Sequence, residues 1–110
     1  MKEHDLVLQE LYKVVLERKA NPSDNSYTSS LLTKGIDKIL KKLGEESTEL
    51  VIAGKGGKRS EIIYETADLF YHALVLLAYQ DIPLDEVLLE LRGRFGTSGL
   101  EEKASRSSAP

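Results

Sequence analysis

Two short acidic segments carry the residue types and spacing that could do chemistry in this sequence. Glu46 and Glu49 are three residues apart, and Glu65 and Asp68 repeat that spacing further along the chain. On an α-helix, side chains three apart lie on one face, about one turn apart. If two such helices pack antiparallel, four carboxylates converge and repel one another unless a cation lies among them. Mg²⁺ prefers carboxylate oxygens and commonly serves phosphate substrates, so this pattern predicts a Mg²⁺ site.

The periodicity of apolar residues indicates the elements that must position these acids. The glycine-rich stretch Gly54 to Lys58 predicts a turn between two long helices, and Ser60 is the expected N-cap of the second of them. Phe70 is expected on the buried face of that helix. No strand pattern is evident, so the predicted fold class is all-α, a bundle of about four helices. The expected helices cover residues 3–19, a second stretch that starts between Ser26 and Thr28 and ends at about residue 54, residues 60–80, and a short segment whose first residue is Pro83.

Composition indicates a single small domain. A chain of 110 residues can bury a core, but a helical hairpin of this size would gain from dimerisation. We expect the domain to cover residues 1–95. Residues 96–110 are rich in Gly, Ser, Thr and Pro and are expected to form a flexible C-terminal tail.

Charge and residue usage exclude several classes of site and partner for this protein. The absence of cysteine excludes disulfides, thiolate metal sites and a cysteine nucleophile. A net charge of −3 gives no general attraction to nucleic acid. The N-terminus has no signal-peptide core, and the apolar run Ala73 to Tyr79 is too short to cross a bilayer. We therefore expect a cytoplasmic protein with no nucleic-acid or membrane partner.

Three lysines precede the acids at a spacing of four: Lys34, Lys38 and Lys42. On one continuous helix they would share a stripe with Glu45 and Glu49. A basic half beside an acidic half suits a Mg–polyphosphate ligand, because the metal and the ammonium groups share the charge of the phosphate oxygens. We expect the lysines to bind substrate phosphates, although a solvated surface is the alternative.

Other side chains near the acids have plainer interpretations. His72 is expected at the edge of the core or as an outer partner of a metal ligand, with direct metal ligation as the remaining alternative. A di-iron site is excluded, because that site needs Glu three residues before His72, where this chain has Leu69. Ser26 and Tyr27 could touch a phosphate or ribose, but capping of a helix explains them as well.

The pattern Glu45-Glu46-x-x-Glu49, fifteen residues, then Glu65-x-x-Asp68 resembles the signature of the all-α nucleotide pyrophosphohydrolases, the MazG-like superfamily. Within it, flanking stretches are similar to the phosphoribosyl-ATP pyrophosphatase family. The resemblance covers about residues 6–95. The stretches that carry it are Ser26-Tyr27-Thr28, Leu32-Thr33-Lys34-Gly35, Lys38-Ile39, Lys42-Leu43-Gly44-Glu45-Glu46 and Glu61 to His72.

The resemblance implies Mg²⁺-dependent cleavage of phosphoribosyl-ATP to phosphoribosyl-AMP and pyrophosphate, the second step of histidine biosynthesis. It also implies a homodimer of helical-bundle type with its active site near the subunit interface. Carried over by position, Glu46, Glu49, Glu65 and Asp68 would hold the metal. Glu45 would be the catalytic base that orients water, an extra ligand or an outer partner, and the three lysines would lie on the phosphate side.

Two other functions remain open at this point. The first is a house-cleaning nucleoside triphosphate pyrophosphohydrolase with the same metal site and a different base pocket. The second is a non-enzymatic helical dimerisation module whose acids are merely solvated.

Overall fold

The computed structural model describes residues 4–96. The described residues form five helices and no strand, which confirms the predicted all-α class. The predicted tail lies almost wholly in residues 97–110, outside the described residues. The first residue of the helix predicted from residue 3 also lies outside them. The helices are α1 (Val7–Ala20), α2 (Tyr27–Lys34), α3 (Ile36–Gly56), α4 (Arg59–Tyr79) and α5 (Leu84–Arg92).

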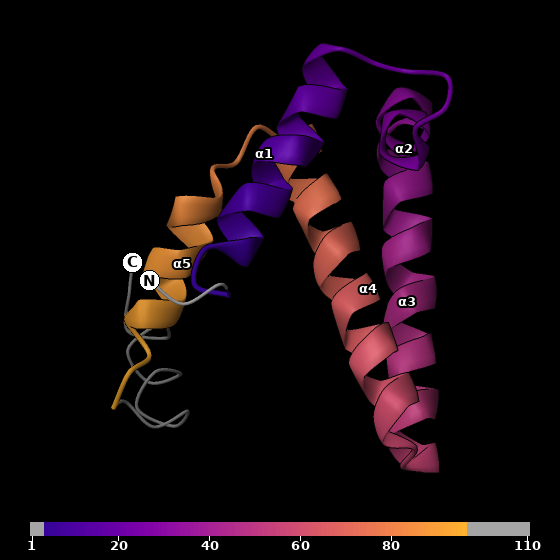
Figure 1. Ribbon diagram of the computed structural model, residues 1–110, viewed down its shortest axis with the longest axis vertical. Coiled ribbons are helices and arrows are strands. Elements are labelled where there is room, and N and C mark those ends of the chain that lie inside the picture. The colour runs from indigo at the N-terminus through magenta and orange to yellow at the C-terminus, as the bar shows by residue number, and fades with distance from the viewer. Residues whose placement is uncertain (1–3, 97–110) are drawn as a thin grey trace, which may run out of the picture.

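A long antiparallel hairpin of α3 and α4 dominates the molecule (Figure 1). The predicted turn between the two long helices is present but shorter than expected: α3 continues through Gly54 to Gly56, and only Gly57 and Lys58 lie between the helices. Gly57 takes the left-handed conformation at φ 79° and its N–H donates to Ala53 O at 3.0 Å. The predicted N-cap at Ser60 is wrong, because α4 already begins at Arg59 and Lys58 is its N-cap. Pro83 likewise precedes α5 as its N-cap instead of opening it.

The prediction of one continuous helix from between Ser26 and Thr28 to about residue 54 is wrong, although α2 does begin at Tyr27. The chain bends at Gly35, whose φ of 95° and ψ of −173° lie in a region that is essentially restricted to glycine. The Gly35 N–H donates to Leu31 O in α2, and its carbonyl accepts from the Ile39 N–H in α3, both at 3.2 Å. The break therefore ends one helix and starts the next, and it removes Lys34 from the lysine stripe expected on one helix.

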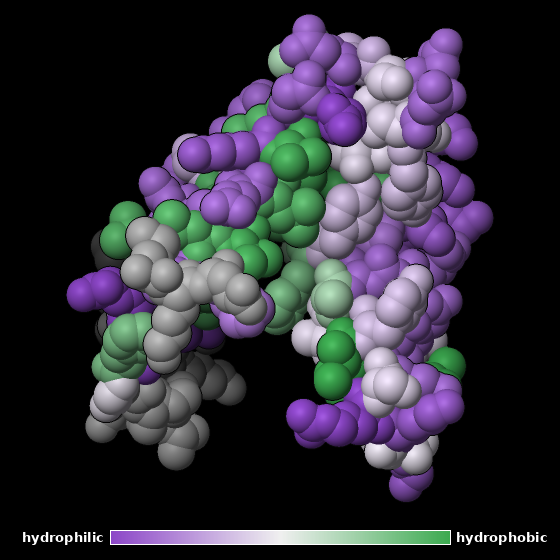
Figure 2. Space-filling model, in the orientation of Figure 1, coloured by the Kyte–Doolittle hydropathy of each residue, from purple (hydrophilic) through white to green (hydrophobic). Residues whose placement is uncertain are grey.

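The core lies where α1 and α2 meet α4 and the first half of α3. Its largest fully buried side chains are Val15, Leu31, Ile39 and Val75. The prediction that Phe70 is buried is wrong, because 52% of this residue is exposed. Figure 2 shows apolar side chains at the surface over α1 and again low on the hairpin of α3 and α4.

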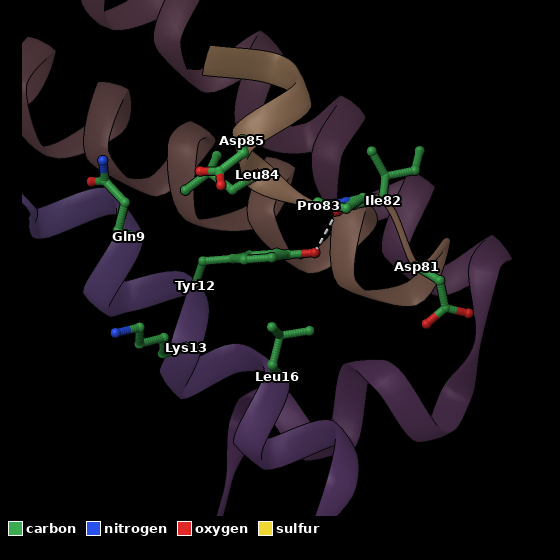
Figure 3. A pocket seen from close by; sticks show the side chains of 9 residues that line it. All are labelled: Gln9, Tyr12, Lys13, Leu16, Asp81, Ile82, Pro83, Leu84 and Asp85. Carbon is green, nitrogen blue, oxygen red and sulfur yellow. Dashed lines mark hydrogen bonds between the residues drawn. The ribbon is translucent and has the colours of Figure 1, made fainter. Parts of the chain in front are cut away.

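Two polar anchors fix α1 against the turn between α4 and α5. The Tyr12 hydroxyl donates to Ile82 O at 2.6 Å, and Lys19 Nζ donates to Ala78 O and to Asp81 Oδ1, both at 2.7 Å. An open cleft of about 530 Å³ lies beside the Tyr12 ring. Figure 3 shows the side chains that line it, from α1, the turn after α4 and the start of α5. None of the residues that line this cleft belongs to the predicted site.

Among the described helices, α4 alone is long and apolar enough, by length and composition, to cross a membrane. The core helix of a soluble protein passes the same test, so this finding is weak evidence for a membrane span. In this structure α4 packs along α3 and against α1, and it carries both Glu65 and Asp68 in its middle.

Candidate metal centre

The structure brings the four predicted metal-binding acids together. Glu46 and Glu49 come from the middle of α3, and Glu65 and Asp68 face them from α4. One carboxylate oxygen from each residue lies within 4.8 Å of the others. The convergence follows from the antiparallel hairpin, because residues before its turn and residues after it meet at the same level. We call these four residues the acidic cluster.

Two carboxylate oxygens of the acidic cluster are buried without a hydrogen-bond partner: Oε2 of Glu46 and Oε2 of Glu65. The Glu46 side chain is only 6% exposed, and its nearest cation is Lys42 Nζ at 3.7 Å from Oε1. A buried carboxylate oxygen without a partner is costly. A donor set made only of carboxylate oxygens fits a hard divalent cation. The acidic cluster therefore has the ligand atoms of a cation site, and two of its oxygens have no hydrogen-bond partner among the described residues.

The electrostatics of the acidic cluster indicate excess negative charge. Burial, followed by the neighbouring carboxylates of Asp68 and Glu49, raises the pKa of Glu46 to about 7. Burial and the charges of Glu49 and Asp68 also raise the pKa of Glu65. Protonation relieves the repulsion at low pH, and a bound cation would relieve it at neutral pH.

The predicted base and the lysines lie at the rim of the acidic cluster or beyond it. Glu45 is exposed and accepts a hydrogen bond from Lys42 Nζ at 3.2 Å, which lowers the pKa of its carboxyl. Lys42 thus bridges Glu45 and Glu46. Lys38 lies one turn earlier on α3. Lys34 is separated from both by the bend, and lines a 270 Å³ hollow with the serines of the α1–α2 loop.

Comparisons with known proteins place the chain in a family. The family model described as phosphoribosyl-ATP pyrophosphohydrolase matches residues 8–95, which include every member of the acidic cluster. The chain belongs to this family. Similar curated relatives carry the name phosphoribosyl-ATP pyrophosphatase. The protein of Geobacter metallireducens is 69% identical over 96% of this chain and 97% of its own length. That of Geotalea daltonii is 71% identical over 94% of this chain and 97% of its own length.

In this member of the phosphoribosyl-ATP pyrophosphohydrolase family, further side chains surround the acidic cluster. His72 is 3% exposed, and its Nδ1 lies 2.8 Å from the backbone carbonyl oxygen of Asp68. Its Nε2 lies 3.2 Å from the hydroxyl of Tyr27, the first residue of α2. Sequence reasoning placed His72 near the ligands but missed its pairing with Tyr27. No sequence signal could have found it, because the two residues are 45 positions apart on different helices.

Proposed function

We propose that the protein hydrolyses the α–β phosphoanhydride of phosphoribosyl-ATP, giving phosphoribosyl-AMP and pyrophosphate, and that Mg²⁺ is its cofactor. The observation that carries this proposal is the convergence of Glu46, Glu49, Glu65 and Asp68 with two buried oxygens left without partners. Relatives named phosphoribosyl-ATP pyrophosphatase that match over nearly their whole length support the substrate. The reaction would be the second step of histidine biosynthesis.

The four residues of the acidic cluster would hold the metal. Bound Mg²⁺ supplies neutralisation of charge on phosphate oxygens and activation of water. Because the four proposed ligands lie on two long helices that pack along each other, their carboxylates would be positioned before the substrate binds, which lowers the free-energy cost of organising the site.

Glu45 and Lys42 would act from the rim. Glu45 stands next to the ligand Glu46 on α3, and its lowered pKa keeps it ionised at neutral pH. An ionised carboxylate there can accept a hydrogen bond from the attacking water and align it for in-line attack. Lys42 would leave its ion pair with Glu45 to neutralise the departing pyrophosphate. Lys38 and Lys34 are proposed to contact phosphate oxygens further from the metal.

We also propose a cytoplasmic homodimer with the active site near its interface. Support comes from large apolar side chains that one chain leaves exposed on the hairpin of α3 and α4. These are Val51, Ile52, Ile63, Tyr64 and Phe70, each more than half exposed. Surface of this kind is typical of association sites, and a second hairpin packed here would complete a four-helix arrangement.

Pyrophosphate release from phosphoribosyl-ATP, beside a panel of nucleoside triphosphates, tests the proposal. We expect turnover of phosphoribosyl-ATP with Mg²⁺ and none with EDTA. Turnover of triphosphates alone would replace the proposed substrate by that of a house-cleaning enzyme. No turnover of any of them would favour the non-enzymatic dimerisation module.

A further inference from the structure

The first turn of α2 is attached to α4 by two side-chain pairs beside the acidic cluster. The Tyr27 hydroxyl reaches Nε2 of His72 at 3.2 Å, and the Thr28 hydroxyl is hydrogen-bonded to that of Tyr71. The rings of Tyr27 and Tyr71 are stacked at 6.3 Å between centroids, and His72 meets both rings edge-on. Two tyrosines thus make similar contacts between the same helices, but only Tyr27 contacts His72 through a hydrogen bond.

Hydrogen-bond chemistry fixes the tautomer of His72. The backbone carbonyl oxygen of Asp68 can only accept, so Nδ1 of His72 must carry the proton that it donates there at 2.8 Å. In the neutral ring Nε2 is then an acceptor, and the Tyr27 hydroxyl must donate to it. Burial raises the pKa of Tyr27, which keeps this donor protonated.

This assignment argues against His72 as a metal ligand. Distance alone permits ligation, because a ring nitrogen of His72 lies within 4.8 Å of oxygens of Glu46 and Asp68. Both ring nitrogens are already committed, however, one to the carbonyl of Asp68 and the other to Tyr27. Nδ1 also lies 3.5 Å from Oδ1 of Asp68, so the His72 ring lies against the Asp68 carboxylate as well as its carbonyl.

We propose that Tyr27 and His72 form a positioning pair for the metal centre. His72 holds Asp68 in the orientation needed for cation binding, and Tyr27 fixes the ring of His72 while tying α2 to the site. The inference rests on the proposed function in one respect, that the acidic cluster binds a divalent cation. Outer partners of metal ligands act in this way, and their loss typically weakens metal affinity by about 10- to 100-fold.

The test compares Tyr27→Phe with Tyr71→Phe in the full-length protein, with Mn²⁺ as the probe cation. Both variants lose one hydroxyl and one hydrogen bond between α2 and α4, but only Tyr27→Phe removes the donor to His72. We expect Tyr27→Phe to weaken Mn²⁺ binding in calorimetry by about tenfold and Tyr71→Phe to leave it within about twofold. Circular dichroism checks that both variants keep the helical content of the wild type.

Two spectroscopic readouts report on His72 itself. In the wild type, ¹⁵N NMR of the metal-free protein should show the His72 ring carrying a proton at Nδ1, and the Nε2 resonance should shift in Tyr27→Phe but not in Tyr71→Phe. Electron spin-echo spectroscopy of the Mn²⁺ complex should show no directly bound imidazole nitrogen. A bound nitrogen, equal losses of affinity in the two variants, or unchanged affinity in Tyr27→Phe would each overturn the inference.

These measurements need no substrate. A wild-type protein that shows the expected Mn²⁺ affinities but releases no pyrophosphate would therefore contradict the proposed reaction and still support the positioning pair.

Discussion

The burial of Glu46 among other carboxylates leads to an unexpected prediction: removing its charge should stabilise the metal-free protein. The perturbation is Glu46→Gln, which keeps the size and shape of the side chain. In the wild type, ionised Glu46 faces Asp68 and Glu49 and leaves Oε2 without a partner. A glutamine amide there carries no charge and can donate hydrogen bonds to the carboxylates that Glu46 repels.

The raised pKa of Glu46 determines how much the free energy of unfolding changes with pH. The folded protein keeps the Glu46 proton up to about pH 7, whereas the unfolded chain releases it near the ordinary value of 4.5. The folded state therefore binds more protons in this window, and the free energy of unfolding falls as pH rises through it. Each pKa unit corresponds to about 1.4 kcal/mol, which gives a loss of up to about 3 kcal/mol for the metal-free wild type. The raised pKa of Glu65 acts in the same direction.

The assay is urea unfolding of both proteins in EDTA, followed by circular dichroism between about pH 5 and pH 8. At about pH 8 we expect Glu46→Gln to be more stable than the wild type by about 1–3 kcal/mol. Between about pH 5 and pH 8 the variant should also lose less stability than the wild type. Saturating Mg²⁺ should reverse the order of stability, because a cation at about 1,000 times its Kd adds about 4 kcal/mol to the protein that binds it.

The neighbouring substitution Glu45→Gln is the matched control. Glu45 is exposed and its pKa is lowered by Lys42, so its removal should not stabilise the protein at any pH in this range. If Glu46→Gln proved less stable than the wild type at about pH 8 without metal, or if both substitutions had the same effect, the electrostatic account of the acidic cluster would be refuted.

Two further predictions concern the rim of the site and the bend before α3. Lys42→Gln should raise KM for phosphoribosyl-ATP by about tenfold through loss of a charged hydrogen bond to phosphate. Lys42→Gln should not weaken Mg²⁺ binding in calorimetry, since Lys42 competes with the cation for Glu46; a fall in Mg²⁺ affinity would contradict this role. Gly35→Ala should lower the free energy of unfolding in urea by about 1–3 kcal/mol, because the φ of 95° at this position is strained for any residue with a Cβ. The new Cβ would meet only the Tyr79 hydroxyl at 3.6 Å, an ordinary contact, so unchanged stability would show that strain at this bend is negligible.

Much of the site could be predicted because it depends on local periodicity. Glu46 with Glu49, and Glu65 with Asp68, each share a helix face by spacing alone, and the glycine-rich turn between the segments requires the two helices to meet. Those two facts are enough to bring the four carboxylates together. Their roles as metal ligands, and that of Glu45 as base, remain predictions.

The features that sequence reasoning missed depend on backbone conformation or on distant contacts. A glycine inside a helix costs only about 1 kcal/mol against alanine, so the apolar pattern around Gly35 is compatible with a continuous helix and does not reveal a φ of 95°. Phe70 is exposed because none of the other described helices covers its side of α4, and spacing within α4 does not specify which side is covered. The pair of Tyr27 and His72 needs the bend, the loop before α2 and the packing of α2 on α4 all at once.

The central claim is that the acidic cluster holds the cation on which hydrolysis depends, and Asp68→Asn tests it most directly. The measurement is Mg²⁺-dependent pyrophosphate release from phosphoribosyl-ATP by Asp68→Asn and by the control Asp85→Asn, which changes an acid outside the cluster. We predict unchanged helical content in both variants, wild-type turnover in Asp85→Asn and only background release in Asp68→Asn. Wild-type turnover by a folded Asp68→Asn protein would contradict the claim.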